Sequence, residues 1–169
     1  CEDGCTLTVP RHSQLALSLI TRKGYVIESV VINGADVTGD VVNGTYMIPS
    51  VSRDTTIVVT FRARTAAEEV LAVDVAGKVY RGEDLLPDAE LNLDFGSSKV
   101  VSGQDGGYLL EDIEDGRHYL EIVVDGKVIG RAQFVLEAAD VSETVVDTLS
   151  DGTQRVRYPK GAEKVYLDF

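Results

Sequence analysis

Short apolar runs alternate with turn signals along the whole of this sequence. The three leucines of residues 15–19 alternate with small or polar side chains, which puts them on one face of a strand. Asn33-Gly34 and Asp125-Gly126 supply the positive φ angles that tight hairpin turns require. Turns recur at roughly the 8–12-residue spacing of a sandwich, and no long amphipathic helix interrupts them. The pattern predicts an all-β fold.

Residues 62–69 break this pattern. They are polar and Ala-rich without a period of 2, and alternation returns at Val70. With 169 residues the chain has room for two small domains. We therefore expect two tandem β domains, residues 1–63 and 70–169, joined by a linker or a single helical turn at 64–69. The second is expected to be a β-sandwich that ends in a C-terminal hairpin, with strands at 153–158 and 163–169.

Alternation also predicts which side chains of the second domain face its core. Successive strand residues point to opposite faces, so a uniformly apolar set of alternate residues marks the inner face. The set expected inside is Leu91, Leu93, Phe95, Leu120, Ile122 and Val124, and the set expected on the other face is Tyr119, Glu121 and Val123.

The charge balance excludes one class of partner. Sixteen basic against 28 acidic residues give a formal net charge of −12, which repels DNA and RNA because nucleic-acid affinity depends on Lys and Arg. The sequence has no apolar run of the about 18 residues that a membrane span needs, so we expect a chain that does not span a membrane. We also expect a monomer.

Both cysteines lie in the first five residues. The chain opens with Cys1 and Cys5 and has neither an initiator Met nor a signal peptide, so we expect a processed product or a piece of a longer protein. Three alternatives stay open for the cysteines: a small disulfide loop, a lipid anchor on Cys1 of a bacterial lipoprotein, or residues without a role. Two cysteines do not complete a zinc site.

Residues 4–62 resemble the divergent B-repeat of internalin-type bacterial surface proteins. The resemblance implies a small extracellular β module used as a spacer or adhesion unit, with a grasp-like fold as one option and no catalytic residues. The segments that carry it are Gly24-Tyr25, Val30 to Thr38, Tyr46 to Val51, and Asp54 to Phe61.

Residues 74–149 resemble the carboxypeptidase regulatory-like domain, a transthyretin-like sandwich. The resemblance supports a fold more strongly than a function, because many unrelated proteins share this architecture. The matching segments are Gly77-Lys78-Val79, Leu86 to Leu91, Gly103 to Tyr108, and Asp115 to Tyr119.

No set of residues in the sequence has the spacing of a catalytic site. It contains no Gly-x-Ser-x-Gly elbow, no phosphate-binding Gly-rich loop and no His-Glu-x-x-His motif, so we expect no enzyme, no cofactor, and no catalytic or metal-binding residue. His12 and His118 fall in different domains, and His118 is expected to be a surface or edge residue. The acidic run 111–115 could offer oxygen ligands to calcium, but it lacks the order of an EF-hand loop and is better interpreted as a solvated loop. Asn43-Gly44-Thr45 fits a glycosylation acceptor, although a hairpin turn explains it equally well.

These observations predict a non-catalytic spacer or adhesion module of a bacterial cell-surface or envelope protein, located outside the cell. Its partner would be a protein or a glycan. The alternative is a glycan- or peptide-binding module of a surface uptake system, for which two or more exposed rings are needed. Candidate rings are Tyr25, Tyr46, Tyr108 and Tyr119. The chain has 7 Tyr, 4 Phe and no Trp, and we expect most of these rings in the cores, which favours the spacer.

Overall fold

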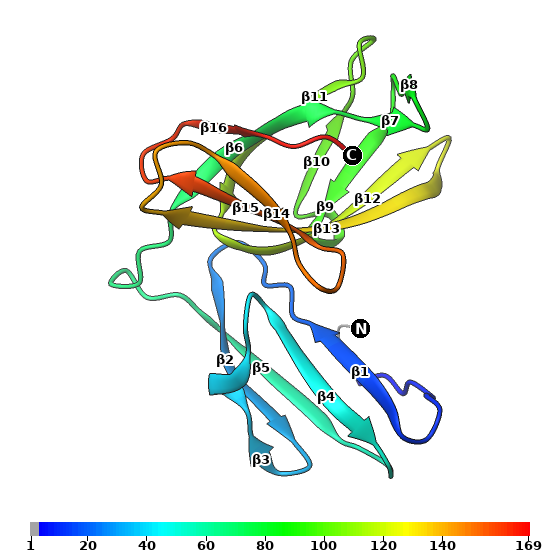
Figure 1. The fold of residues 1–169 in the computed structure, drawn as a ribbon, viewed down its shortest axis with the longest axis vertical. Coiled ribbons are helices and arrows are strands. Elements are labelled where there is room, and N and C mark those ends of the chain that lie inside the picture. The colour runs from blue at the N-terminus through cyan, green and yellow to red at the C-terminus, as the bar shows by residue number, and fades with distance from the viewer. Residues whose placement is uncertain (1–3) are drawn as a thin grey trace. The chain divides into compact units, whose positions relative to one another are not determined.

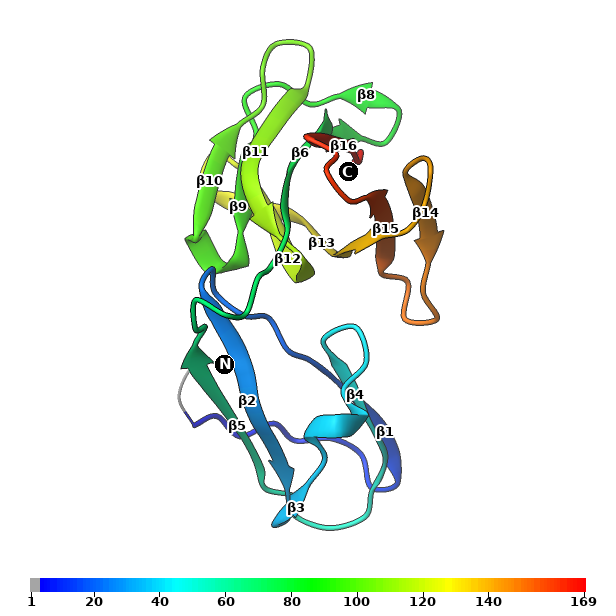
Figure 2. The ribbon, with the colours of Figure 1, turned by 90° about the vertical axis from the view of Figure 1, so that its left-hand side faces the viewer.

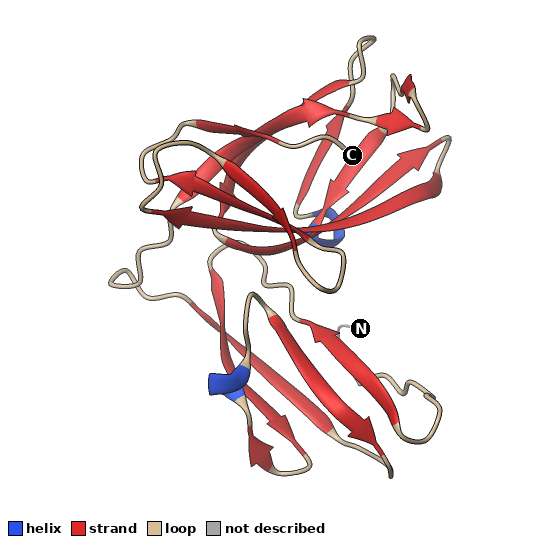
Figure 3. Cartoon of the chain, viewed as in Figure 1, coloured by secondary structure: helices blue, strands red, loops and turns tan. Residues whose placement is uncertain are grey.

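The computed structural model describes residues 4–169, and this part of the chain is nearly all β (Figure 3). Its only helical elements are the 3-10 turns η1 (Thr38–Asp40) and η2 (Asp94–Gly96). Neither is long or apolar enough to cross a membrane. The strands form several separate sheets. The prediction of an all-β chain of small tandem domains is confirmed.

The described chain divides into two compact units. The first comprises the residues up to Leu19 together with Ile27–Arg62, and the second comprises Ile20–Val26 and Ala63–Phe169. The short segment Ile20–Val26 therefore packs with the second unit, although it lies inside the first in sequence.

The first unit contains two small sheets. One pairs β1 with β4 in antiparallel fashion, and the other has the strand order β3-β2-β5. Asn33 and Gly34, at the β2–β3 turn, have φ angles of 50° and 84°, which a tight hairpin turn requires. The strand bounds are β1 (Ser13–Ser18), β2 (Tyr25–Ile32), β3 (Ala35–Asp36), β4 (Thr45–Val51) and β5 (Ile57–Ala63).

The core of the first unit is small. Its described buried apolar residues are Leu19, Val30 and Ile48. Domains of this size bury little apolar surface and often depend on a cross-link. Cys5 is disulfide-bonded. Cys1 lies outside the described residues, so the disulfide-loop and lipid-anchor interpretations that fall on it stay predictions.

The second unit is a sandwich of a six-stranded and a three-stranded sheet (Figure 1). The strand orders are β10-β9-β12-β13-β15-β14 and β11-β6-β16, and in the turned view of Figure 2, β14 lies outside β15 at the end of the larger sheet. A small separate hairpin joins β7 to β8. The strand bounds are β6 (Ala72–Lys78), β7 (Tyr80–Arg81), β8 (Asp84–Leu85), β9 (Glu90–Leu93), β10 (Ser98–Val101), β11 (Gly107–Glu114), β12 (Gly116–Val124), β13 (Lys127–Ala139), β14 (Val145–Thr148), β15 (Gln154–Pro159) and β16 (Lys164–Tyr166).

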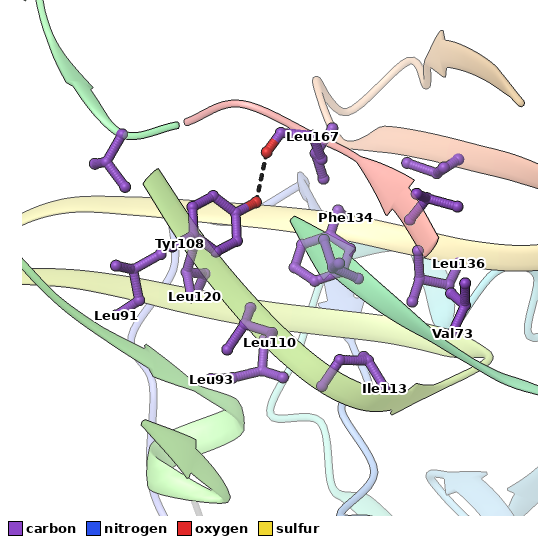
Figure 4. Close-up of a cluster of buried hydrophobic side chains, with 14 of the residues drawn as sticks. Val73, Leu91, Leu93, Tyr108, Leu110, Ile113, Leu120, Phe134, Leu136 and Leu167 are labelled. Atoms are coloured by element: carbon purple, nitrogen blue, oxygen red, sulfur yellow. Dashed lines mark hydrogen bonds between the residues drawn. The ribbon is translucent and has the colours of Figure 1, made fainter. Parts of the chain in front are cut away.

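The sandwich core lies between these two sheets (Figure 4). The smaller sheet contributes Val75 and Leu110, which are fully buried. Tyr108 is also buried, and its hydroxyl donates a hydrogen bond of 2.5 Å to the carbonyl oxygen of Leu167. Burial raises the pKa of Tyr108, so this hydroxyl stays a donor at physiological pH. The larger sheet contributes Leu91, Leu93, Leu120, Ile122, Phe134, Leu136, Val156 and Tyr158.

The expected C-terminal hairpin is wrong, because the two tail strands join different layers. β15 pairs in parallel with β13 in the larger sheet, whereas β16 pairs in parallel with β6 in the smaller one. The turn after Pro159 carries the chain across the edge of the sandwich instead of folding it back on itself. Val156 in β15 and Val165 in β16 are both buried, and they belong to different sheets.

The predicted inner face is confirmed with one exception. Leu91, Leu93, Leu120 and Ile122 are buried, and Val124 packs against the core while partly exposed. Phe95 was expected inside but has 62% of its surface exposed. The strand ends at Leu93, and η2 turns the chain through positive φ angles, so the alternation of β9 does not extend to Phe95.

The register of β12 can be tested with two neighbouring substitutions. We expect Ile122→Ala to cost about 2–5 kcal/mol of the free energy of unfolding, because it leaves a cavity in the core. Glu121→Ala should cost under about 1 kcal/mol, since this carboxylate lies on the outer face, where it is 27% exposed, and its ion-pair partner Arg131 is largely exposed. Denaturant unfolding measures both values. A larger loss for Glu121→Ala would mean that the register is off by one.

The connection between the units predicts a protease cleavage site. After β5 the chain runs without regular structure to β6, and Glu69 is exposed. Glu68 is held in a turn, because its Oε2 accepts hydrogen bonds from the Thr65 N–H and hydroxyl groups. We expect glutamyl endopeptidase to cut first at Glu69 and to leave two resistant fragments, separable under denaturing conditions. Early cuts inside β11 or β12 would contradict two separately folded units.

Candidate functional site

A buried ionisable pair lies at the end of β9. His118 and Asp94 are 6% and 5% exposed, and His118 Nδ1 lies 2.7 Å from Asp94 Oδ2. His118 Nε2 lies 2.7 Å from the carbonyl oxygen of Glu114. Both neighbours are hydrogen-bond acceptors when Asp94 is ionised, so both ring nitrogens then donate. The expectation that His118 lies at the surface is therefore wrong.

The same carboxylate fixes an unusual backbone corner. Asp94 Oδ1 accepts a 2.9 Å hydrogen bond from the backbone N–H of Tyr119. Asp94, Phe95 and Gly96 have φ angles of 46°, 59° and 91°, so three successive residues occupy the left-handed region. For an L-residue other than Gly this conformation costs roughly 1–2 kcal/mol. A bulky residue such as Phe95 rarely adopts it, and such strain concentrates at functional sites.

The corner places the ring of Phe95 on the outer face of the six-stranded sheet. Its ring stacks on Tyr119, with centroids 5.0 Å apart and an interplanar angle of 20°. Tyr119 alternates along β12 with the buried His118 and Leu120, so its side chain lies on the outer face. The result is a stacked aromatic pair with Phe95 exposed and Tyr119 half-buried, which we call the Phe95–Tyr119 platform.

Polar groups gather at the hydroxyl end of Tyr119. Its hydroxyl donates a 2.9 Å hydrogen bond to Glu121 Oε1, and Arg131 Nε donates to the same oxygen at 3.2 Å. Partial burial and the hydrogen bond to Glu121 raise the pKa of Tyr119, so the hydroxyl keeps its proton. The guanidinium of Arg131 remains largely exposed. A carboxylate and a guanidinium therefore border the platform.

The other predicted rings are distributed differently. Tyr108 lies in the core, Tyr46 lies in β4 and is half-buried, and Tyr25 in β2 is exposed. Contrary to the expectation that most rings lie in cores, five of the eleven aromatic residues are exposed and only three are buried. The exposed five are Tyr25, Phe61, Tyr80, Phe95 and Tyr166.

The acidic run 111–115 was expected as a solvated loop, but it lies mostly in β11, and its carboxylates bind side chains from other segments. Asp112 forms an ion pair with Lys23. Glu114 accepts two hydrogen bonds from the Arg64 guanidinium, at 3.0 and 2.7 Å, and Asp115 accepts one of 2.6 Å from the Tyr158 hydroxyl. Among residues 4–169, no group of three or more His, Cys, Asp or Glu side chains is placed to hold a metal ion.

A second polar cluster surrounds Arg117 on the outer face of β12. Only 1% of its side chain is exposed, and its Nη1 donates to Gln133 Oε1 and to Thr153 Oγ1, both at 2.8 Å. Its Nη2 donates to Asp151 Oδ2 at 3.1 Å. These bonds hold the loop between β14 and β15 onto the sheet, so Arg117 is committed to structure.

His12 lies in the first unit, in the turn before β1. It is exposed, and its backbone N–H donates to the carbonyl oxygen of Val51. The structure thus places the two histidines in different units, each with a local structural environment.

No family model, curated protein or solved structure matches the chain. The likenesses to B-repeats and to carboxypeptidase regulatory-like domains therefore stay expectations.

Two ion-paired carboxylates predict how stability depends on pH. Partial burial alone would raise the pKa of Glu114, but hydrogen bonds from Arg64 and from the Gly24 N–H outweigh it and lower the pKa below its usual 4.5. Burial alone would likewise raise the pKa of Asp151, but its interactions with Thr153 and Arg117 outweigh burial and lower this pKa. A depressed carboxyl pKa stabilises the fold above the unfolded-state pKa and loses that effect as the pH falls.

We therefore expect the free energy of unfolding of the second unit to fall as the pH drops below about 4.5, the usual Glu value. Chemical denaturation between pH 7 and pH 3 measures this. Glu114→Gln removes one titrating group and should flatten the decline, and an unchanged slope would contradict the assignment. Glu143→Gln, at an exposed position in the loop before β14, is the matched control.

Proposed function

We propose that this chain is a non-catalytic interaction module of a bacterial cell-surface or envelope protein, acting as a spacer or adhesion unit. The observation that carries the proposal is the state of His118. Both of its ring nitrogens are occupied, one by Asp94 and one by the carbonyl oxygen of Glu114, so the imidazole has no free nitrogen for proton transfer to a substrate. The charged side chains near His118 likewise form structural contacts that connect strands and loops of the second unit.

The two-unit all-β architecture suits such a module. Sandwiches joined by short connections present surfaces without needing a reaction centre, and the same architecture serves many binding tasks. The expected resemblance of residues 4–62 to an extracellular β module is the ground for proposing a location outside the cell.

Surface exposure provides the test. Antibodies raised against the purified chain should label intact cells of the bacterium that encodes it, and brief protease treatment of those cells should release peptides from residues 62–72. Labelling that appears only after lysis would overturn the proposed location. A cytoplasmic protein of known abundance, followed in the same samples, controls for leaking cells.

A second candidate function is glycan binding by a surface uptake system. The Phe95–Tyr119 platform favours it, because a spacer does not need an exposed ring stacked on a half-buried one and bordered by hydrogen-bonding groups.

A further inference from the structure

We propose that the Phe95–Tyr119 platform is a binding subsite for neutral polysaccharide, in which one sugar ring lies against the free face of Phe95. This inference rests on the proposed interaction function and assigns it a ligand class and a place on the chain. The stacked ring of Tyr119 covers one side of Phe95, and 62% of the Phe95 surface is exposed.

The ring is held in advance of any ligand. Asp94 fixes the corner through its bonds to His118 and to the Tyr119 N–H, and all three of these groups belong to the sandwich framework. His118 is in turn stacked on the buried ring of Phe134, with centroids 5.1 Å apart. An immobile ring loses little conformational entropy on binding, which favours affinity.

The strain at this corner supports a binding role. A sequence selected only for stability would place Gly or Asn at position 95, where φ is 59° and the side chain points to solvent. A large apolar ring at such a position is unfavourable for both backbone and solvation. An observed backbone outlier of this kind is a physical ground for inferring function.

The chemistry around the ring selects a sugar. One face of a pyranose presents C–H groups that pack on an aromatic ring, while its hydroxyls need planar donors and acceptors at the rim. The Glu121 carboxylate accepts hydrogen bonds and the Arg131 guanidinium donates them, and both lie at the hydroxyl end of Tyr119. The net charge of −12 disfavours anionic polymers. Of neutral and anionic polysaccharides, the charge therefore favours the neutral ones.

The test measures binding of the whole chain to polysaccharides by affinity electrophoresis and calorimetry. The probes are soluble amylose, mixed-linkage β-glucan, xyloglucan and galactomannan, with polygalacturonate as the anionic comparison. We expect at least one neutral polymer to bind and polygalacturonate not to bind. Phe95→Gly should weaken that binding by about tenfold or more, as loss of a central aromatic anchor does.

Phe95→Gly separates binding from folding, because Gly accepts the left-handed conformation without strain. Its thermal midpoint should stay close to that of the wild type. Tyr166→Ala is the matched control, since it removes a 71%-exposed ring from β16 in the other sheet and should leave binding unchanged. Equal binding by wild type and Phe95→Gly, or no binding to any neutral probe, overturns the subsite. Surface labelling of cells would still stand in either case, so the two proposals fail separately.

Discussion

Gly77→Ala should destabilise the second unit by more than about 3 kcal/mol and release the β16 segment from the sandwich. A Cβ atom on Gly77 would lie 1.9 Å from the carbonyl oxygen of Leu167 and 2.7 Å from its carbonyl carbon. Both are backbone atoms, so no side-chain rotation relieves the clash. The segment must move, and it then loses the hydrogen bonds from Leu167 N–H to Ala76 and from Phe169 N–H to Lys78.

Hydrogen exchange and denaturant unfolding together check this expectation. The amides of residues 165–169 should lose protection in Gly77→Ala, and the unfolding midpoint should fall. Gly130→Ala is the control in the same unit, because a Cβ there would meet only the side chain of Ile122, at 3.4 Å or more, which is ordinary van der Waals contact. If both variants have the same unfolding midpoint, the close approach of Leu167 is not the reason that position 77 requires Gly.

His118→Ala should cost about 2–5 kcal/mol, because it leaves a cavity in the core and removes a hydrogen-bond partner of a buried carboxyl group. Asp94 is 5% exposed in the native protein, and the variant would leave it the Tyr119 N–H as the remaining hydrogen-bond donor of this cluster. The substitution also removes the ring that stacks on Phe134. Urea unfolding at pH 7 gives the value.

Asp94→Asn is the informative companion to His118→Ala. Asn tolerates a left-handed backbone, its carbonyl can accept from the Tyr119 N–H, and its amide can donate to His118 Nδ1. We therefore expect a loss of under about 1.5 kcal/mol, within the range for one exchanged hydrogen bond. A loss as large as that of His118→Ala would show that the charge of Asp94, and not its hydrogen bonds, stabilises the corner.

Strand alternation predicted most of the second unit, and its failures have local causes. Leu91 and Leu93 are buried as expected, but Phe95 continues the period of 2 only in the sequence. The signal of the corner was present in Asp94 and Gly96, because Asp tolerates and Gly prefers positive φ. A hydrophobic pattern reports the preferred face of a side chain and carries no information about where the backbone leaves the strand.

His118 could have been assigned correctly from the same pattern. It shares the parity of Leu120 and Ile122 along β12, so alternation places it on the inner face. The polar character of His suggested the surface instead. No pattern in the sequence shows the partner of His118, because Asp94 reaches it from the left-handed corner η2 that follows β9.

The strands of the tail were foreseen, whereas their pairing was not. Residues 154–159 and 164–166 have the expected alternation, and a short connection between two strands usually makes a hairpin. Here each strand finds a parallel partner in a different sheet, β13 for one and β6 for the other. The choice depends on which sheet edges are open in the folded sandwich, and this is a property of the whole unit.

The parallel pairing of β16 with β6 also sets the order of events in synthesis. Val75 meets Val165, so one sheet of the sandwich is incomplete until nearly all of the second unit has left the ribosome. Contacts so distant in sequence slow folding, because the long loop between them must close first. Until then the edge of β6 that β16 will cover has no neighbour, and exposed strand edges favour pairing with other chains. A nascent chain therefore completes this sheet only after residues 164–166 have emerged.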